Sequence, residues 1–266
     1  MKLSGCVVAI TGGGSGLGAD ACRLAVGRGA SVVAVIDRDR EAAEKVAAEI
    51  GGRALTADVT DEEQVRAVID SLGGVDIWVH NAGIGDKGST FRENEMWYRM
   101  WEVHVMAIVY ATRALLPRWL RRGSGHFAAV ASSNALTSNP VSASYAATKH
   151  AELALVEWLQ FTYASRGVTA SCFCPKGMLT PLLLAAADSD KYAASAVRTA
   201  VSSPDAARML LDNIESGSFL ATTYAPVLEE YELRARDPDA YLRLMQSVHD
   251  DLVPHVGAVP EPTPRS

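Results

Sequence analysis

Short apolar runs alternate with longer amphipathic stretches along most of the chain. The runs have the length and the Val, Ala and Ile content of strands that are buried on both faces. We expect seven of them, at 6–11, 31–37, 53–57, 75–80, 126–131, 168–174 and 219–222. Helical periodicity fills the spaces between them, at 19–28, 40–50, 61–72, 95–120 and 143–164. This order predicts an α/β fold, a doubly wound parallel sheet of about seven strands with helices on both faces.

The rest of the pattern concerns the carboxyl-terminal third. No internal repeat and no long linker interrupts the chain, which predicts a single domain over 1–266. A stretch at 182–199 mixes Ala, Leu and Ser, as in a helix that closes over a substrate or in a plain packing helix. A helical extension is expected at 224–253, and the prolines of 254–266 predict a loose tail.

Composition mainly excludes classes of function. The chain has 25 basic and 31 acidic side chains, a net charge of −6, which argues against a binder of nucleic acid or of anionic membranes. It has no apolar run of membrane-spanning length and no signal-peptide pattern, so we expect a cytoplasmic protein. No Cys-x-x-Cys pair or His-rich segment occurs, so no metal site is expected. The cysteines are interpreted as reduced core residues, namely Cys6, Cys22, Cys172 and Cys174.

A glycine-rich turn follows the first predicted strand. It reads Thr11-Gly12-Gly13-Gly14-Ser15-Gly16-Leu17-Gly18, and a helix opens directly after it. Glycine clusters also form ordinary tight turns, but between a strand and a helix they let backbone N–H groups approach a pyrophosphate at the positive helix end. A P-loop is excluded because no Gly-Lys-Ser/Thr follows.

An acidic residue ends the second predicted strand. Asp37 follows Gly18 by 19 residues, where a carboxylate can accept hydrogen bonds from an adenosine ribose. The same carboxylate repels a 2′-phosphate, so the sequence favours NAD over NADP. Arg38 leaves NADP open, since an arginine there can stack on adenine or hold a phosphate.

A tyrosine and a lysine stand four residues apart at the start of a predicted helix. This spacing puts Tyr145 and Lys149 on one helix face. A phenol that acts as a base near neutral pH must lose about 3 pKa units, or about 4 kcal/mol. An ammonium about 4 to 5 Å away supplies about that much at an effective dielectric constant of about 20. Alone, the spacing is also that of an ordinary surface pair, so the nucleotide turn upstream is what favours chemistry here.

Together these motifs resemble those of the short-chain dehydrogenases/reductases, and the resemblance covers nearly the whole chain. The matching motifs are Thr11-Gly12-x-x-x-Gly16-x-Gly18, Asp58-Val59, Asn81-Ala82-Gly83 and Tyr145-x-x-x-Lys149. The resemblance implies a Rossmann fold and a nicotinamide cofactor. The cofactor-binding residues it implies are Gly12, Ser15, Gly16, Leu17, Gly18, Asp37, Arg38, Asp58, Val59, Asn81, Ala82, Gly83, Tyr145, Lys149, Pro175, Gly177, Met178 and Thr180.

The resemblance also implies catalytic roles. Tyr145 is then the proton-transfer group, and Lys149 promotes loss of its proton and binds the nicotinamide ribose. A serine polarises the substrate oxygen, and the family's usual spacing of 13 residues before the tyrosine selects Ser132. Ser133 is the alternative if this loop is one residue shorter.

Two positions depart from the family pattern. His104 stands where the family usually has an asparagine that helps to hold a relay water, and it is either a relay group or a packed core histidine. After the sixth strand the family's Pro-Gly is replaced by Pro175-Lys176-Gly177, which shifts the glycine by one place. Lys176 either binds an anion or points to solvent.

We therefore expect an NAD-dependent enzyme that interconverts a secondary alcohol and a ketone on an apolar small molecule. An NADP-dependent ketoreductase is the alternative enzyme, and a redox-silent NAD-binding sensor is the alternative from another class. The presence of Ser132, Tyr145 and Lys149 speaks against the sensor. The helix around 151–161 is apolar on all sides, and by resemblance it packs against its copy in a homodimer or homotetramer.

Overall fold

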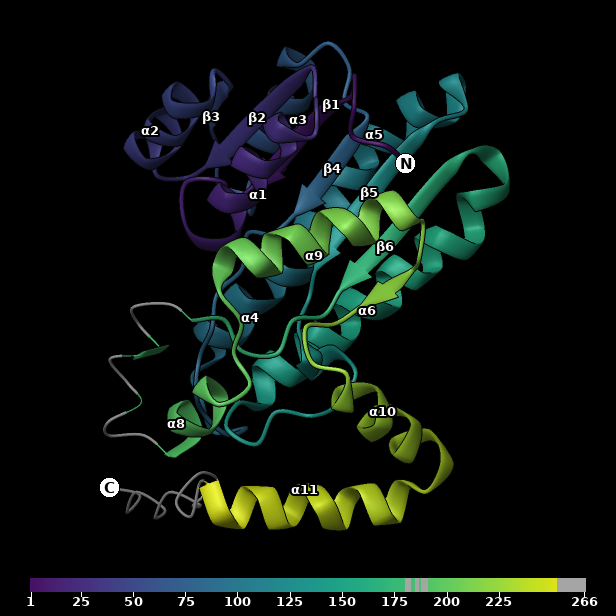
Figure 1. Ribbon diagram of the computed structural model, residues 1–266. Coiled ribbons are helices and arrows are strands. Elements are labelled where there is room, and N and C mark those ends of the chain that lie inside the picture. Colours follow the sequence, from purple (N-terminus) through teal and green to yellow (C-terminus); the bar gives the residue numbers. More distant parts are fainter. Residues whose placement is uncertain (180–182, 185–186, 188–190, 253–266) are drawn as a thin grey trace, which may run out of the picture.

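Seven parallel strands form one sheet in the computed structural model, in the order β3-β2-β1-β4-β5-β6-β7 (Figure 1). The structure describes residues 1–179, 183–184, 187 and 191–252. The strands are β1 (Val7–Thr11), β2 (Val32–Asp37), β3 (Arg53–Thr56), β4 (Ile77–His80), β5 (Gly125–Val130), β6 (Val168–Phe173) and β7 (Leu220–Ala221). The order reverses between β1 and β4, and in such sheets ligands bind at this point, outside the carboxyl ends of the strands. The predicted doubly wound fold is confirmed.

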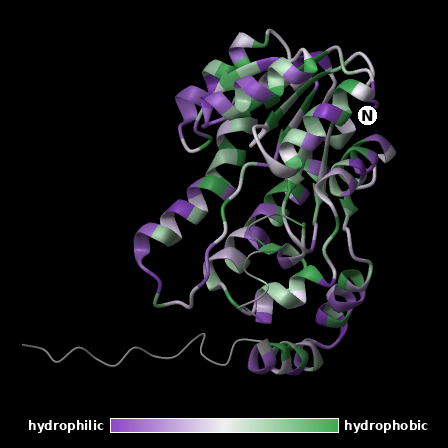
Figure 2. Cartoon of the chain, turned by 60° about the vertical axis from the view of Figure 1, so that its left-hand side comes forward, coloured by the Kyte–Doolittle hydropathy of each residue, from purple (hydrophilic) through white to green (hydrophobic). Residues whose placement is uncertain are grey.

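Helices cover both faces of the sheet. One face carries α1 (Gly16–Gly27), α2 (Arg40–Ile50) and α9 (Ser203–Ser216), and the other carries α3 (Glu62–Ser71), α5 (Ala107–Arg122) and α6 (Ala143–Tyr163). Each face has its own buried apolar cluster, which is why the central strands are apolar on both sides. Figure 2 shows these hydrophobic strands enclosed by helices that turn hydrophilic residues outward.

Local signals start and stop the helices near the site. The side chains of Asp39 and Asp61 accept hydrogen bonds from the first turns of α2 and α3, and Ser142 does the same for α6. Gly51 and Gly123 end α2 and α5 in the left-handed conformation that glycine adopts without strain.

The prediction of one regular helix at 95–120 is wrong, because a π-helical turn interrupts the helical stretch. It consists of α4 (Asn94–Trp101), a π-helical turn η1 (Glu102–Met106) and α5. A π-turn inserts one extra residue per turn, which periodicity does not reveal. This turn carries His104, whose side chain is fully buried.

Several predictions at the edges of the sheet are also wrong. β3 is only partly buried because it lies at one edge, and β7 has two residues rather than four.

The cysteines and the segment after β6 differ in part from the prediction. Cys6 is half-buried, although the other three cysteines are buried, and all four are free thiols. Of the helix predicted at 182–199, the structure gives α8 (Lys191–Val197), while 182, 185–186 and 188–190 lie outside the described residues.

Two helices follow the sheet beyond the carboxyl ends of its strands (Figure 1). They are α10 (Pro226–Arg236) and α11 (Pro238–Leu252), within the helical extension predicted at 224–253. The hydroxyl of Tyr241 accepts a hydrogen bond of 2.7 Å from the N–H of Ser138, and Arg234 donates to the Leu136 carbonyl at 3.0 Å. The extension therefore docks on the segment after β5. The tail predicted at 254–266 lies outside the described residues.

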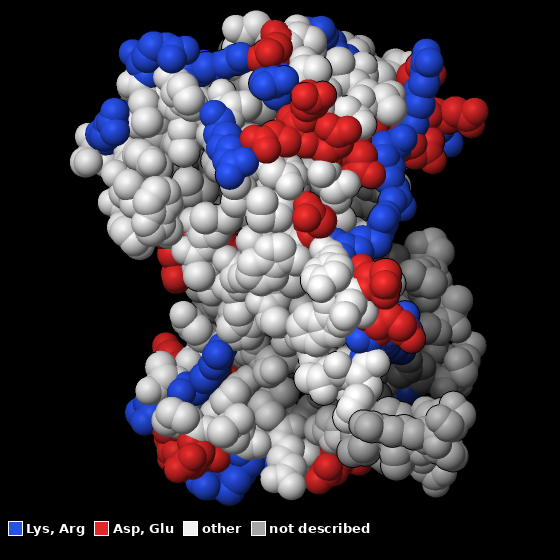
Figure 3. Space-filling view, turned by 180° about the vertical axis from the view of Figure 1, so that it is seen from behind, with Lys and Arg blue, Asp and Glu red and all other residues white. Residues whose placement is uncertain are grey.

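The surface carries mixed charge. On the side opposite to that of Figure 1, acidic and basic side chains lie next to one another over the upper part of the molecule (Figure 3).

The helices differ in how much apolar surface they expose. Within the described part of the chain, none of them combines the length and the apolar character needed to cross a bilayer. On α6, Trp158 and Phe161 are 45% and 73% exposed.

Candidate active site

The glycine turn between β1 and α1 is shaped by close backbone packing. Gly12 and Gly16 have φ angles of +63° and +50°, which side chains rarely allow. A Cβ on Gly18 would overlap the carbonyl oxygen of Gly12. Ser15 stands at the amino end of α1 without a side-chain cap bond, and the first turn holds no acidic residue. The first N–H groups of α1 are therefore available to an anion such as a pyrophosphate.

Asn81, at the end of β4, ties this turn to the neighbouring strand. Its side-chain amide donates to the carbonyls of Thr11 and Gly12 at 3.0 and 3.2 Å. The Thr11 hydroxyl in turn accepts the N–H groups of Asn81 and Ala82 at 3.0 and 3.1 Å. The Asn81-Ala82-Gly83 motif thus holds the turn against β4, at the switch point of the sheet.

Asp37 ends β2 beside the same turn. One carboxylate oxygen accepts the N–H of Gly14 at 3.0 Å, and the other accepts the N–H of Asp39. A carboxylate has about four acceptor positions, so two remain for the hydroxyls of a ribose. Arg38 is exposed next to it.

Asp58 and Val59 follow β3, the strand that pairs with β2. The Asp58 carboxylate accepts the N–H and the hydroxyl of Thr60 at 2.9 and 2.8 Å. Burial opposes its ionisation, but these bonds and the charge of Arg38 outweigh burial and lower the pKa of Asp58. Val59 is buried against Val103 of η1. The adenine contact predicted for these two residues stays a prediction.

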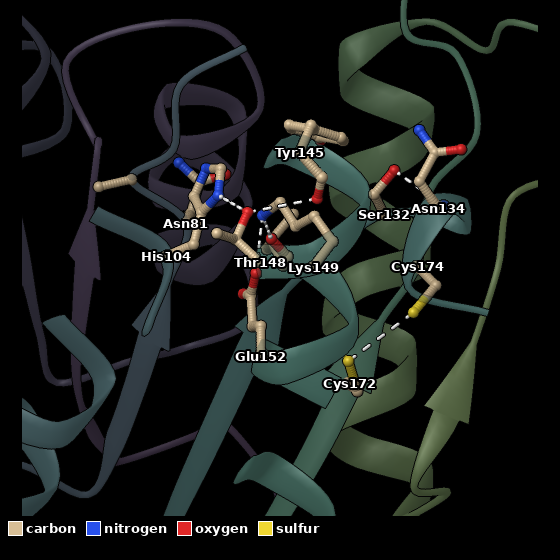
Figure 4. A network of polar contacts seen from close by, with 12 residues as sticks. Asn81, His104, Ser132, Asn134, Tyr145, Thr148, Lys149, Glu152, Cys172 and Cys174 are labelled. Atoms are coloured by element: carbon tan, nitrogen blue, oxygen red, sulfur yellow. Dashed lines mark hydrogen bonds and ion pairs between the residues drawn. The ribbon is translucent and has the colours of Figure 1, made fainter. Parts of the chain in front are cut away.

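A cleft of about 940 Å³ opens next to Asn81, the residue that is bonded to the glycine turn. Its walls include Ser132, Tyr145 and Lys149, so the structure brings the three predicted catalytic side chains together. The Ser132 hydroxyl accepts the N–H of Asn134 at 3.1 Å and faces the cleft (Figure 4). Ser133 lines a neighbouring cavity instead, and its N–H donates to the Pro175 carbonyl. Between the two serines, the geometry favours Ser132.

Tyr145 and Lys149 lie on the first turns of α6. The Ser142 hydroxyl caps this helix by accepting the N–H of Tyr145 at 3.2 Å. The Lys149 ammonium lies 5.7 Å from the centre of the Tyr145 ring. It also donates to the Val130 carbonyl at 3.3 Å, and only 4% of the lysine side chain is exposed.

His104 packs against this pair from η1. Its ring lies 5.6 Å from that of Tyr145, edge to face. The N–H of Ile84 donates to Nε2 at 3.2 Å, so Nδ1 carries the proton and faces the Thr148 hydroxyl at 2.9 Å. Burial lowers the pKa of His104 to about 2. It is therefore a neutral group that holds the loop after β4 against α6, with both nitrogens engaged.

Glu152 was not expected at the site. It lies one turn after Lys149, is fully buried, and its Oε2 is 2.8 Å from the Lys149 ammonium. Figure 4 shows the lysine between Tyr145 and this carboxylate. Of the two glutamates of this helix, Glu152 shares the helix face of Val156 and Leu159, and an acidic residue on an apolar face was the available signal, since a buried carboxylate needs a partner.

The segment after β6 closes the cleft on its other side. Pro175, Gly177 and Met178 line it, and a Cβ on Gly177 would stand 2.8 Å from the carbonyl of Ala196. Lys176 turns its ammonium over the ring of Tyr224, at 4.3 Å from the centre. Thr180, the other predicted nicotinamide contact, lies outside the described residues.

The arrangement fits a dinucleotide. The uncapped end of α1 can take the pyrophosphate, Asp37 the ribose of the adenosine, and the cleft the nicotinamide with a substrate. In the described part of the chain, no cluster of His, Cys, Asp and Glu side chains has the arrangement of a metal site. The fold and this crevice define a dinucleotide-binding protein of the Rossmann type.

The chain belongs to the short chain dehydrogenase family, whose sequence profile matches residues 6–191. A 1-deoxy-11-beta-hydroxypentalenate dehydrogenase from Streptomyces exfoliatus is 36% identical over 196 residues, 69% of this chain and 71% of that protein. A 3beta-hydroxysteroid dehydrogenase 1 from Eggerthella lenta is 35% identical over 209 residues, 74% of this chain and 78% of that protein.

Solved structures agree with this family. A short-chain dehydrogenase/reductase from Burkholderia phymatum, determined in complex with NAD, superposes with a TM-score of 0.80. It is 25% identical, and the match covers 90% of this chain and 96% of that one. The chain is thus an oxidoreductase by family.

Proposed function

We propose that this protein is an NAD-dependent dehydrogenase that interconverts a secondary alcohol and a ketone on an apolar small molecule. The observation that carries the proposal is the position of Ser132, Tyr145 and Lys149 on the wall of one cleft, which is also lined by Asn81, the residue bonded to the glycine turn. Bound NAD would supply a carbon centre that accepts hydride from the carbinol carbon.

The three side chains divide the remaining work. The Ser132 hydroxyl is positioned to donate a hydrogen bond to the substrate oxygen and to orient it. Tyr145 takes the hydroxyl proton during oxidation and returns it during reduction. The Lys149 ammonium, beside the Tyr145 ring, stabilises the phenolate that forms.

Asp37 supports NAD rather than NADP. Its carboxylate is held in place by two backbone N–H groups, so it cannot swing away from a 2′-phosphate without losing both bonds. Solved structures of this fold include one determined with NAD, from Burkholderia phymatum, and one determined with NADP, from Burkholderia cenocepacia, so the choice of NAD rests on Asp37.

Apolar walls support an apolar substrate. Ile84, Ala131, Val141 and Met178 line the cleft around the reacting groups. Two relatives are named for a hydroxypentalenate and a hydroxysteroid.

We also propose that Trp158 and Phe161, exposed on α6, pack against a second copy in a homodimer or homotetramer. Light scattering would measure the number of copies.

Titration of the protein with NADH and NADPH by fluorescence tests the cofactor. Tighter binding of NADH by tenfold or more is expected, and a preference for NADPH would contradict the proposal. A screen of apolar secondary alcohols with NAD, followed by absorbance of the reduced nicotinamide, then tests the reaction.

Tyr145→Phe is the control for the chemistry. We expect it to lower turnover by about 10³-fold or more, because the group that transfers the proton is removed, while NADH affinity stays within about threefold, because Lys149 and the other predicted cofactor contacts are kept. Tight NADH binding with no turnover on any alcohol or ketone would instead support a redox-silent sensor.

A further inference from the structure

A second charge lies behind the catalytic lysine. Glu152 and Lys149 are three residues apart on α6, and their ion pair of 2.8 Å is buried, with 0% and 4% of the side chains exposed. The other carboxylate oxygen of Glu152, Oε1, has no hydrogen-bond partner among the described residues. The carboxylate is therefore held by the ammonium alone.

The groups around this pair are neutral. Burial lowers the pKa of His80, on β4, to about 3 and that of His104, on η1, to about 2. The hydrogen bond with Cys174 and burial raise the pKa of Cys172, on β6, so Cys172 faces the pair as a thiol. Among the described residues, the titratable groups facing the pair are Tyr145, His80, His104 and Cys172. On its open side Tyr145 shares the wall of the cleft with the charged residues Asp86, Lys87, Arg92 and Lys176. On its buried side the charged residues are Lys149 and Glu152.

Stability alone is a weak reason for such a pair. Desolvation of two charges generally offsets their attraction, and an apolar pair of similar volume is often as stable. Burial works against the charge of Lys149, but Glu152 outweighs burial and the pKa of the ammonium is raised. Burial also raises the pKa of Glu152, against the effect of Lys149.

We propose that Glu152 is a positioning residue for the reaction, whose carboxylate anchors the Lys149 ammonium and partly cancels its field at Tyr145. This inference rests on the proposed role of Tyr145 and Lys149 in proton transfer. With both groups ionised the pair carries no net charge, and the phenol feels a dipole in place of a full positive charge. Removal of the carboxylate would therefore leave the phenol beside the full positive charge of the ammonium.

The test is a phenolate titration that needs no substrate. Ultraviolet absorbance of phenolate is followed with pH for the full chain and for its Tyr145→Phe variant, and the difference isolates Tyr145 from the other seven tyrosines. The same difference is measured with Glu152→Gln in both proteins. We expect this substitution to lower the midpoint by about one pH unit, since it removes a negative charge from the phenolate's surroundings.

Two further variants keep the result interpretable. Glu157→Gln removes the same charge from an exposed position of α6 and should leave the midpoint unchanged. Glu152→Asp withdraws the carboxylate by one methylene and should lower the midpoint of the phenolate titration by less than Glu152→Gln does. This variant provides the test if Glu152→Gln is not recovered as folded protein. An unchanged midpoint would overturn the proposal, because the pair would then be structural. A raised midpoint would overturn it too, since Glu152 would then serve to keep Lys149 charged.

Turnover separates this inference from the function on which it rests. If Tyr145→Phe keeps full activity, the proposed function fails. If Tyr145→Phe is inactive but Glu152→Gln does not move the phenolate midpoint, only the role of Glu152 fails.

Discussion

The nucleotide half of the molecule, β1 to α3, and the catalytic half, from β4 onward, build their sites from different material. In the nucleotide half the groups at the glycine turn are backbone N–H groups, freed by Gly12, Gly16 and Gly18. In the catalytic half they are buried side chains, above all Lys149 and Glu152. The geometry of the glycine turn is determined by which residues lack a Cβ. The geometry of the buried charges is determined by side chains that several helices and strands place around them.

This difference predicts that acid opens the catalytic half first. Burial lowers the pKa values of His80, His104 and His126 to about 3, about 2 and about 3, while residues 1–79 contain no histidine. Because the unfolded chain binds these protons first, stability is complete above about pH 6.5 and falls as the pH drops toward about 3. Each buried histidine removes about 2 kcal/mol at about pH 5.

Urea denaturation near neutral pH and near pH 5 measures the loss, and amide hydrogen exchange locates it. His126 is the residue for a control because it lies outside the site, bonded to Thr169 and Ser171. His126→Gln should reduce the loss at about pH 5 by about 2 kcal/mol. An equal loss in this variant, or first exchange in β1 to α3, would contradict the comparison.

Adding one methyl group to the glycine turn should produce the next largest effect. A Cβ on Gly18 would meet the Gly12 carbonyl and the Asn81 amide, so Gly18→Ala must push the turn away from β4. We expect NADH affinity to fall by about 100-fold, or about 2.7 kcal/mol, in a fluorescence titration. Gly27→Ala, in the same helix with nothing near its Cβ, should bind NADH normally. Equal affinity in both variants would show that the turn does not depend on close packing.

The same contrast explains what could be predicted from the sequence. Periodicity located the strands and the glycine cluster located the turn, because both features depend on neighbours in sequence. It missed the π-turn around His104 and the pair of Glu152 with Lys149, because these depend on what β4, β5 and β6 place against α6. Ser132 and Ser133 are adjacent in sequence, and only the fold shows which of them lines the cleft.

In the proposed function, Asp37 is the side chain of the nucleotide half that selects NAD. Asp37→Asn removes the charge but can keep one of the two backbone bonds. NADH affinity should fall by about tenfold and NADPH affinity should rise, since a charged hydrogen bond is worth about 1.5 to 3 kcal/mol. Asp39→Asn is the matched control, because it removes the same charge while asparagine still caps α2. An unchanged ratio of the two affinities in Asp37→Asn would assign the choice to Arg38.

The smallest expected effect tests whether the carboxyl-terminal extension belongs to the catalytic half. Tyr241 is 2% exposed, and its hydroxyl accepts the N–H of Ser138, in the loop that leads from Ser132 to Tyr145. Tyr241→Phe leaves that N–H without its partner, which should weaken the docking of α11 by about 1 kcal/mol. Amide protons of residues 238–252 should then exchange about fivefold faster. Tyr98→Phe, at a position 68% exposed on α4, should leave this exchange unchanged.

The region in which exchange changes decides the question. If exchange in Tyr241→Phe speeds up across β4, β5 and α6 as well, the extension and the catalytic half open as one unit. Unchanged exchange of 238–252 would show that apolar packing alone holds α11.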